Sequence, residues 1–251
     1  MDIGLYQSAS ALDGLQQYQN IISSNIAASH VAGYKRTEIS FEAIQAGEMS
    51  APNSDKIHGS IPASFASIRG QLNFSQGEIR QTNNPMDFAL SGDGFMVVEN
   101  PADEQVKYTR NGHFYISPEG TIVDSQGWEL QGEAGSIKTN PTAGPVTVDV
   151  NGQLFQGETS IDAFKMVAFE TPHEKLTKAE GGFFIKEEGE EGEKATEVKV
   201  MQGFLEQGNA KPIREMVDMI RVSRAYEMNR KVIQELDGMM GRAISTLGQT
   251  R

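Results

Sequence analysis

Several kinds of residue are scarce or missing in this 251-residue sequence, and each absence narrows the protein's chemistry. There is no cysteine, which excludes a disulfide framework, a thiolate metal site and a thiol nucleophile. Tryptophan occurs once, and 12 phenylalanines stand against 26 glycines, so the sequence offers many turns for each unit of core. The composition is therefore not typical of a compact enzyme core.

Long apolar runs are also missing. No stretch approaches the roughly 18 consecutive apolar residues that a membrane-spanning helix requires. The opening residues MDIGLYQSAS lack the basic and apolar regions of a secretory signal peptide. We therefore expect neither membrane insertion nor export that depends on a cleavable signal.

Basic residues are outnumbered, and the net charge is −12. Most of the negative charge lies between residues 37 and 207, whereas residues 208–251 carry a basic excess. An acidic middle argues against a nucleic-acid partner, because binding to phosphates requires a positive surface. We interpret this charge as a solvated surface that maintains solubility.

The two ends of the chain carry apolar residues at alternating three- and four-residue spacing, which is typical of a coiled-coil seam. Such a seam can be buried by pairing the two terminal helices with each other or by packing them against copies of the same chain. The first stripe comprises Leu5, Ser8, Leu12, Leu15, Gln19, Ile22 and Ile26, and the second comprises Met219, Val222, Tyr226, Asn229, Ile233, Leu236, Met240, Ala243 and Leu247.

Local signals predict where the terminal helices begin and end. The first is expected over residues 2–28, with Gly33 beyond its end. The last is expected over residues 212–247, because Asn209 can cap exposed amides and Pro212 suits a first helical turn.

The stretch between the helices has two parts with different sequence patterns. Residues 37–75 show no sustained periodicity and contain Pro52 and Pro62, which favours an extended linker. From Gly77 onward, short apolar runs alternate with turn signals, which predicts all-β structure. The runs are 95–98, 106–109, 114–116, 121–123, 128–130, 146–150, 154–155, 163–169, 183–185 and 198–201.

These patterns together predict an α+β fold. Residues 1–36 and 208–251 are expected to pair as an α-helical coiled-coil domain, residues 37–75 to form the extended linker, and residues 76–207 to form a central all-β domain.

No set of residues forms a recognisable catalytic, metal or cofactor site. The four histidines, His30, His58, His113 and His173, stand far apart without a second ligand at metal-binding spacing. We therefore expect no enzyme activity and no cofactor. A methionine-rich stripe indicates either an adaptable binding face or ordinary core filling; it comprises Met216, Met219, Met228, Met239 and Met240.

Four segments, in order, resemble the flagellar basal-body rod and hook proteins, and the resemblance covers nearly the whole chain. The first is NIAASHVAGYKR at residues 25–36, in which Ala28 and His30-Val31-Ala32 depart from the family pattern. The others are TNNPMDFALSGDGF, then YTRNGHFYISPEG, and finally GFLEQGNAKPIREMVDMIRVSRAYEMNRK. Residues 131–195 carry the weakest resemblance.

The resemblance implies a structural subunit of an axial tube, with the terminal helices in its inner wall and the β domain facing outward. It implies contacts with copies of itself, with proximal and distal rod proteins and with the hook. It also implies delivery by the flagellar type III export apparatus into a rod that crosses the periplasm. The predicted assembly interface comprises Leu5, Leu12, Leu15, Ile22, Asn25, Ile26, Met219, Val222, Tyr226, Ile233, Leu236, Met240 and Leu247.

Within the family, the short length and Lys211-Pro212 favour the proximal-rod branch, although the TNN segment at residues 82–84 also occurs in the distal-rod branch. Two other functions remain open from the residues alone. One is a soluble β-domain binding module with helical tethers. The other, less favoured, is a hydrolase that uses carboxylates of the acidic middle.

Overall fold

The computed structural model describes residues 3–49, 61–140, 143–187 and 192–248, with side chains described except at 3–6, 41–49, 61–67 and 247–248. The helices are α1 (Ile3–Ala27), α2 (Pro172–Lys175), α3 (Pro212–Gly248) and the 3-10 turn η1 (Glu180–Gly182). The strands are β1 (Thr37–Met49), β2 (Ile61–Leu72), β3 (Ile79–Gln81), β4 (Phe88–Ser91), β5 (Phe95–Glu99), β6 (Val106–Thr109), β7 (Tyr115–Ile116), β8 (Ile122–Val123), β9 (Glu129–Gly132), β10 (Gly135–Ser136), β11 (Val146–Val148), β12 (Gln153–Gln156), β13 (Thr159–Ala163), β14 (Met166–Ala168), β15 (Leu176–Lys178), β16 (Phe184–Lys186), β17 (Glu193–Lys194), β18 (Lys199–Gln202) and β19 (Phe204–Glu206).

The chain divides into two compact units. Unit 1 consists of Met1–Ile26, Thr37–Gln71 and Pro212–Arg251, and unit 2 consists of Ala27–Arg36 and Leu72–Lys211. Each unit therefore draws on segments that are far apart in the sequence.

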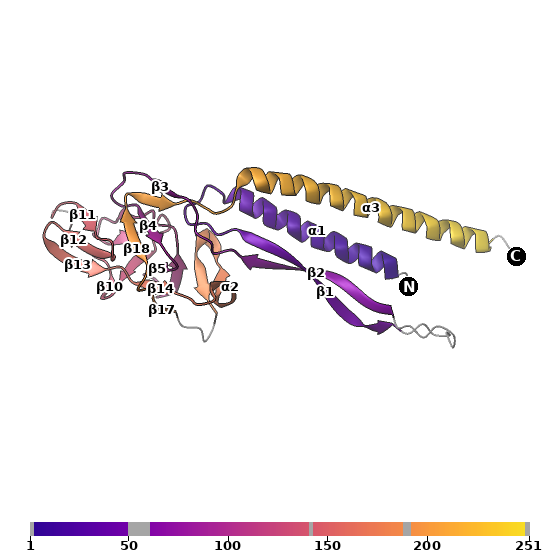
Figure 1. Ribbon diagram of the computed structural model, residues 1–251, viewed down its shortest axis with the longest axis horizontal. Helices are drawn as coiled ribbons and strands as arrows, with labels where there is room; N and C mark the ends of the chain where they lie inside the picture. The colour runs from indigo at the N-terminus through magenta and orange to yellow at the C-terminus, as the bar shows by residue number, and fades with distance from the viewer. Residues whose placement is uncertain (1–2, 50–60, 141–142, 188–191, 249–251) are drawn as a thin grey trace. The chain divides into compact units, whose positions relative to one another are not determined.

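Unit 1 contains α1, α3 and a two-stranded sheet of β1 and β2. Helix α1 lies between α3 and this sheet (Figure 1). A Cβ atom added to Gly14 would lie 3.2 Å from the Cδ1 atom of Ile68, so α1 packs closely on β2 there. The small size of Gly14 permits this approach.

Polar contacts connect α1 to α3 along their lengths. Gln19 donates a hydrogen bond to Ser223 over 3.3 Å, and the Asn229 side chain donates one to the Ser8 carbonyl over 3.0 Å. Later residues of α3 thus meet earlier residues of α1, so the two helices run antiparallel.

The predicted coiled-coil domain of paired terminal helices is wrong. Helix α1 has a sheet on one side and α3 on the other, so its apolar residues are shared between two neighbours instead of forming one helical seam. The contacts that join it to α3 include polar side chains such as Gln19 and Asn229, where a coiled coil would place apolar knobs.

The predicted extended linker at residues 37–75 is also wrong, because it contains the long strands β1 and β2. A two-stranded sheet alone in water is marginally stable. Here α1 covers one part of it: a Cβ atom at Gly70 would lie 3.5 Å from Ile21. Support from a helix distant in sequence leaves no local periodic signal, which is why the sequence did not show these strands.

Unit 2 is built from antiparallel β-structure. Its largest sheet has the order β15-β16-β6-β5-β9-β8-β7, with β10 on β9 and with β14 between β5 and β17. A three-stranded sheet β11-β12-β13 and the pairs β18-β4 and β19-β3 complete the unit. Several strands match predicted apolar runs, and β6 covers residues 106–109 as expected.

Strand β5 separates two hydrophobic clusters. Met96 and Val98 belong to the cluster that contains Phe88 and Phe114, while Phe95 and Val97 belong to a second cluster. Side chains alternate between the faces of a strand, so β5 is buried on both sides. This two-sided burial gives unit 2 a core of its own.

No helix in the described part of the chain is both long and apolar enough to cross a membrane.

Candidate assembly site

The predicted interface residues of the helices are mostly turned into unit 1. Ile22 and Val222 are buried, with exposed fractions of 1% and 5%. Leu5 and Leu247 lie outside the residues whose side chains are described. The half-buried members are Leu12, Leu15, Ile26, Met219, Tyr226, Ile233, Leu236 and Met240.

Asn25, another predicted interface residue, is buried and has partners inside unit 1. Its side-chain amide donates to the Thr37 carbonyl over 3.0 Å, and its oxygen accepts from the Thr37 amide over 3.1 Å. The same amide donates to the buried carboxylate of Glu215 over 3.3 Å. Asn25 thereby joins the end of α1 to the start of β1 and the first turn of α3.

A second group of α3 residues is apolar and exposed. The methionine-rich stripe is divided: Met219 and Met240 are half-buried, whereas Met216, Met228 and Met239 are exposed. Sequence reasoning did not single out the other exposed members, because they fall outside the seam spacing. These are Ile213, Val217, Ile220, Val232 and Ile244.

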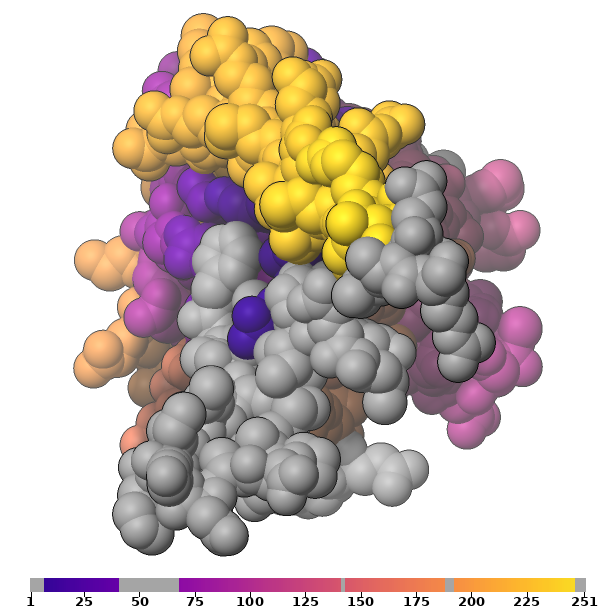
Figure 2. All heavy atoms as spheres, turned by 90° about the vertical axis from the view of Figure 1, so that its right-hand side faces the viewer, coloured from indigo at the N-terminus to yellow at the C-terminus, as the bar shows by residue number. Residues whose placement is uncertain are grey.

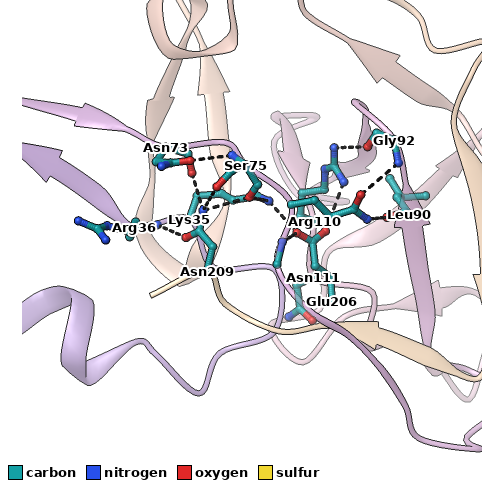
Figure 3. Close-up of polar contacts among 12 residues, drawn as sticks. Lys35, Arg36, Asn73, Ser75, Leu90, Gly92, Arg110, Asn111, Glu206 and Asn209 are labelled. Atoms are coloured by element: carbon teal, nitrogen blue, oxygen red, sulfur yellow. Dashed lines mark hydrogen bonds and ion pairs between the residues drawn. The ribbon is translucent and has the colours of Figure 1, made fainter. Parts of the chain in front are cut away.

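Unit 2 contains a buried cluster of charged side chains centred on Glu206 (Figure 3). One oxygen of Glu206 accepts from the Lys35 ammonium over 2.7 Å and from the Gly77 amide over 2.8 Å. Its other oxygen accepts from the Arg110 guanidinium over 3.3 Å. Arg110 also donates to the Gly92 carbonyl over 2.6 Å, so the cluster connects β19 to four other segments.

Burial dominates the electrostatics of this cluster. It lowers the pKa of Lys35 and that of Arg110, because removal from water disfavours a charged form. The negative charge of Glu206 opposes both shifts. Lys35 and Arg110 therefore depend on the Glu206 carboxylate to remain charged without a large cost in folding free energy.

Asn209 extends the polar network and does not act as the predicted helix cap. Its side-chain oxygen accepts from the Arg36 amide over 2.7 Å, and its amide donates to the carbonyls of Asn73 and Ser75 over 2.8 and 3.0 Å. The prediction failed because an asparagine before a helix can also join distant backbone segments, which no local pattern distinguishes.

A glycine allows the backbones to meet beside the cluster. Gly33 has a φ of 68°, and a Cβ atom there would lie 2.2 Å from the Arg110 carbonyl carbon. A side chain would therefore be strained and would also collide with backbone. Its amide donates to the Glu206 carbonyl over 2.8 Å, which fixes the segment that follows α1 beside β19.

The cluster assembles residues from three of the four segments that carried the family resemblance. Lys35, Arg110 and Glu206 stand far apart in the sequence and meet through the fold. The chain passes from unit 2 into unit 1 after Arg36 and again after Lys211. The cluster residues Lys35 and Glu206 lie close to these two points in the sequence. We interpret the cluster as a lock, meaning an ionic contact that holds together the two segments that end at Arg36 and Lys211. The sequence alone matched these three residues to the family motifs but did not predict that they lie together in the fold.

His113 also has a structural explanation. Its Nδ1 atom lies 2.6 Å from the buried carboxylate of Asp87, and its Nε2 atom bonds to the Tyr115 hydroxyl. The bridge between Asp87 and His113 joins two backbone segments. Within residues 3–49, 61–140, 143–187 and 192–248, no three His, Asp or Glu side chains gather as a metal site requires.

Comparison with known proteins gives two family matches. Residues 89–156 match the model described as flagellar hook protein FlgE/F/G D1 domain, and residues 201–246 match that of the flagellar basal body rod FlgEFG protein C-terminal. The first lies in unit 2, and the second includes β19 and most of α3.

Individual relatives match over almost their full lengths. The flagellar basal-body rod protein FlgF of Caulobacter vibrioides is 30% identical over 99% of each chain, and that of Mesorhizobium japonicum is 27% identical over 99% of each. The rod protein FlgG of Buchnera aphidicola subsp. Schizaphis graminum is 30% identical over 94% of this chain and 96% of its own. The predicted order, with the proximal branch FlgF ahead of FlgG, is confirmed, and the chain belongs to the family of flagellar basal-body rod proteins.

Proposed function

We propose that this chain, a structural subunit of the rod family and not an enzyme, enters the axial shaft of the flagellum through α1 and α3. The observation that carries the proposal is full-length similarity to rod proteins, together with exposed apolar side chains along α3. An exposed apolar face on a soluble chain typically marks a surface that a partner covers.

The division of the molecule supports separate roles for its parts. Unit 2 has two hydrophobic clusters and the Glu206 cluster, so it has its own means of folding. Unit 1 leaves α3 with many exposed side chains after Met240. Subunit packing would bury these residues, and the completed shaft would transmit torque.

The partners follow from the family. The chain assembles with other axial flagellar proteins in the basal body. We further propose that the flagellar type III export apparatus delivers it to a rod crossing the periplasm. The lack of cysteine supports this route, because no disulfide has to form after export.

Leu236→Asp tests the proposed role of α3. Leu236 is half-buried within the predicted seam, near Ile233 and Met240. A carboxylate there would disfavour burial against a neighbour, since an unpaired buried charge is costly. We expect cells carrying the variant to lack rods and motility, while the purified variant retains the thermal melt of unit 2.

Gln234→Asp is the matched control, because it adds the same carboxylate at an exposed position of α3. It should leave motility intact. Normal motility in the Leu236→Asp strain would instead show that this part of α3 is not an assembly surface.

A further inference from the structure

Helix α3 carries a compact apolar patch in its first turns. Ile213, Met216, Val217 and Ile220 are exposed by 80%, 52%, 43% and 54%. Their spacing of three, four and seven residues places them on one face of the helix. We call these four residues the N-terminal patch.

A second exposed apolar patch lies in the last turns of α3. Met239 and Ile244 are exposed by 50% and 71%, and Ala243 between them is also exposed. We call these three residues the C-terminal patch. Figure 2, which looks toward this end of α3, shows its last described turns in yellow at the molecular surface.

The charges that precede the two patches are opposite in sign. Lys211 and Arg214 are exposed at the start of the N-terminal patch, and Glu235 and Asp237 are exposed just before the C-terminal patch. Arg242 is exposed within the C-terminal patch, and Asp218 pairs with Arg221 beside the N-terminal patch. Each patch could therefore pair with the other through both apolar contact and charge.

The two patches cannot meet within one molecule. They are centred about 25 residues apart on a continuous helix, which separates them by about 40 Å at 1.5 Å per residue. Any contact between them must therefore join two subunits. Because the contact uses two different surfaces, it repeats head to tail and builds an open filament instead of a closed dimer.

We propose that the N-terminal patch of α3 receives the C-terminal patch of α3 from the next rod-family subunit along the axis. This inference rests on the proposed function and names the surface that it requires. The family model matched by residues 201–246 describes a C-terminal segment of rod and hook proteins, so neighbouring subunits of the family carry a corresponding helix.

Site-specific photocrosslinking tests the contact in assembled rods. The photoreactive residue p-benzoylphenylalanine replaces Ile220 in one strain and Ile244 in another, and basal bodies are isolated after irradiation and analysed by peptide mass spectrometry. We expect the probe at Ile220 to label the last turns of a rod-family C-terminal helix. The probe at Ile244 should label the first turns of such a helix.

A probe at Arg230, exposed on α3 between the patches, is the positional control and should give neither adduct. Adducts of both patch probes in other segments, or none in basal bodies that contain the labelled chain, would overturn the inference while leaving the proposed function standing. Basal bodies that lack even the chain labelled at Arg230 would overturn both.

Charge reversal tests how much the charged side chains beside the patches contribute to the contact. Lys211→Glu with Arg214→Glu places carboxylates opposite the acidic flank of the C-terminal patch, because subunits that repeat head to tail present their α3 helices in the same direction. Like charges at an interface are strongly unfavourable. We expect at least about a tenfold loss of the Ile220 adduct. Arg230→Glu with Lys231→Glu reverses two neighbouring exposed charges between the patches and should retain it; equal losses in both double variants would contradict the assignment.

Discussion

Replacing Glu206 with glutamine should lower the free energy of unfolding of unit 2 by about 3–5 kcal/mol, the usual cost of removing one partner from a buried ion pair. Lys35 and Arg110 would remain buried without their shared carboxylate. The melting temperature should fall on the order of 10 °C for a unit of this size. Thermal unfolding followed by circular dichroism measures the change.

Glu119→Gln provides the control, because Glu119 is exposed and its substitution should change stability by no more than about 0.5 kcal/mol. The pH dependence gives a second signature. The folded-state pKa of Lys35 lies below its ordinary value of 10.5, and loss of Glu206 should lower it further. Between the folded-state pKa of Lys35 in the variant and that in the parent, folding releases the Lys35 proton in the variant but not in the parent, so the variant gains stability relative to the parent as the pH rises. The deficit of Glu206→Gln should therefore shrink as the pH rises through this interval, which lies below 10.5; a melt equal to the parent at pH 7 would contradict the lock.

Hydrogen exchange of the isolated chain should differ by orders of magnitude between the end of α3 and the strands of unit 2. All side chains described after Met240 are exposed, and Gly238 and Gly241 each weaken the helix by about 1 kcal/mol relative to alanine. Strand β5 lies between two hydrophobic clusters and β4 contributes Phe88 and Leu90 to one of them, so the amides of both strands should open only with the whole unit.

Mass spectrometry of deuterium uptake makes this comparison directly. Amides of residues 233–246 should exchange rapidly in the free chain and become protected in isolated basal bodies. Equally strong protection of both regions in the free chain would show that α3 is stable without neighbours, and its ordering on assembly would have to be abandoned.

Some of this structure could be predicted because the signals are local. Pro212 correctly marked the start of α3, since proline suits a first helical turn. The apolar run at residues 106–109 correctly predicted β6, because this signal is local as well. The family motifs likewise consist of short segments that can be recognised without knowing their contacts.

The failures concern features that depend on distant contacts. The strand β2 packs against α1 where Ile68 meets Gly14, and no sequence pattern near residue 68 indicates this contact. The seam spacing of the helices predicted a coiled coil. However, α1 also packs against the sheet of β1 and β2, and Gln19 donates a hydrogen bond to Ser223 between the helices. The convergence of Lys35, Arg110 and Glu206 is a product of the fold, so matching the motifs separately did not reveal it.

The central claim is that this chain builds the rod through its terminal helices, and a density map of the intact basal body with its side chains assigned tests it most directly. The account predicts that α1 and α3 lie in the wall of the rod and that Ile213, Met216, Val217 and Ile220 are covered by a helix of an adjacent subunit. A map in which the chain occupies the rod while these side chains face solvent, or in which unit 2 alone makes the subunit contacts, would contradict it.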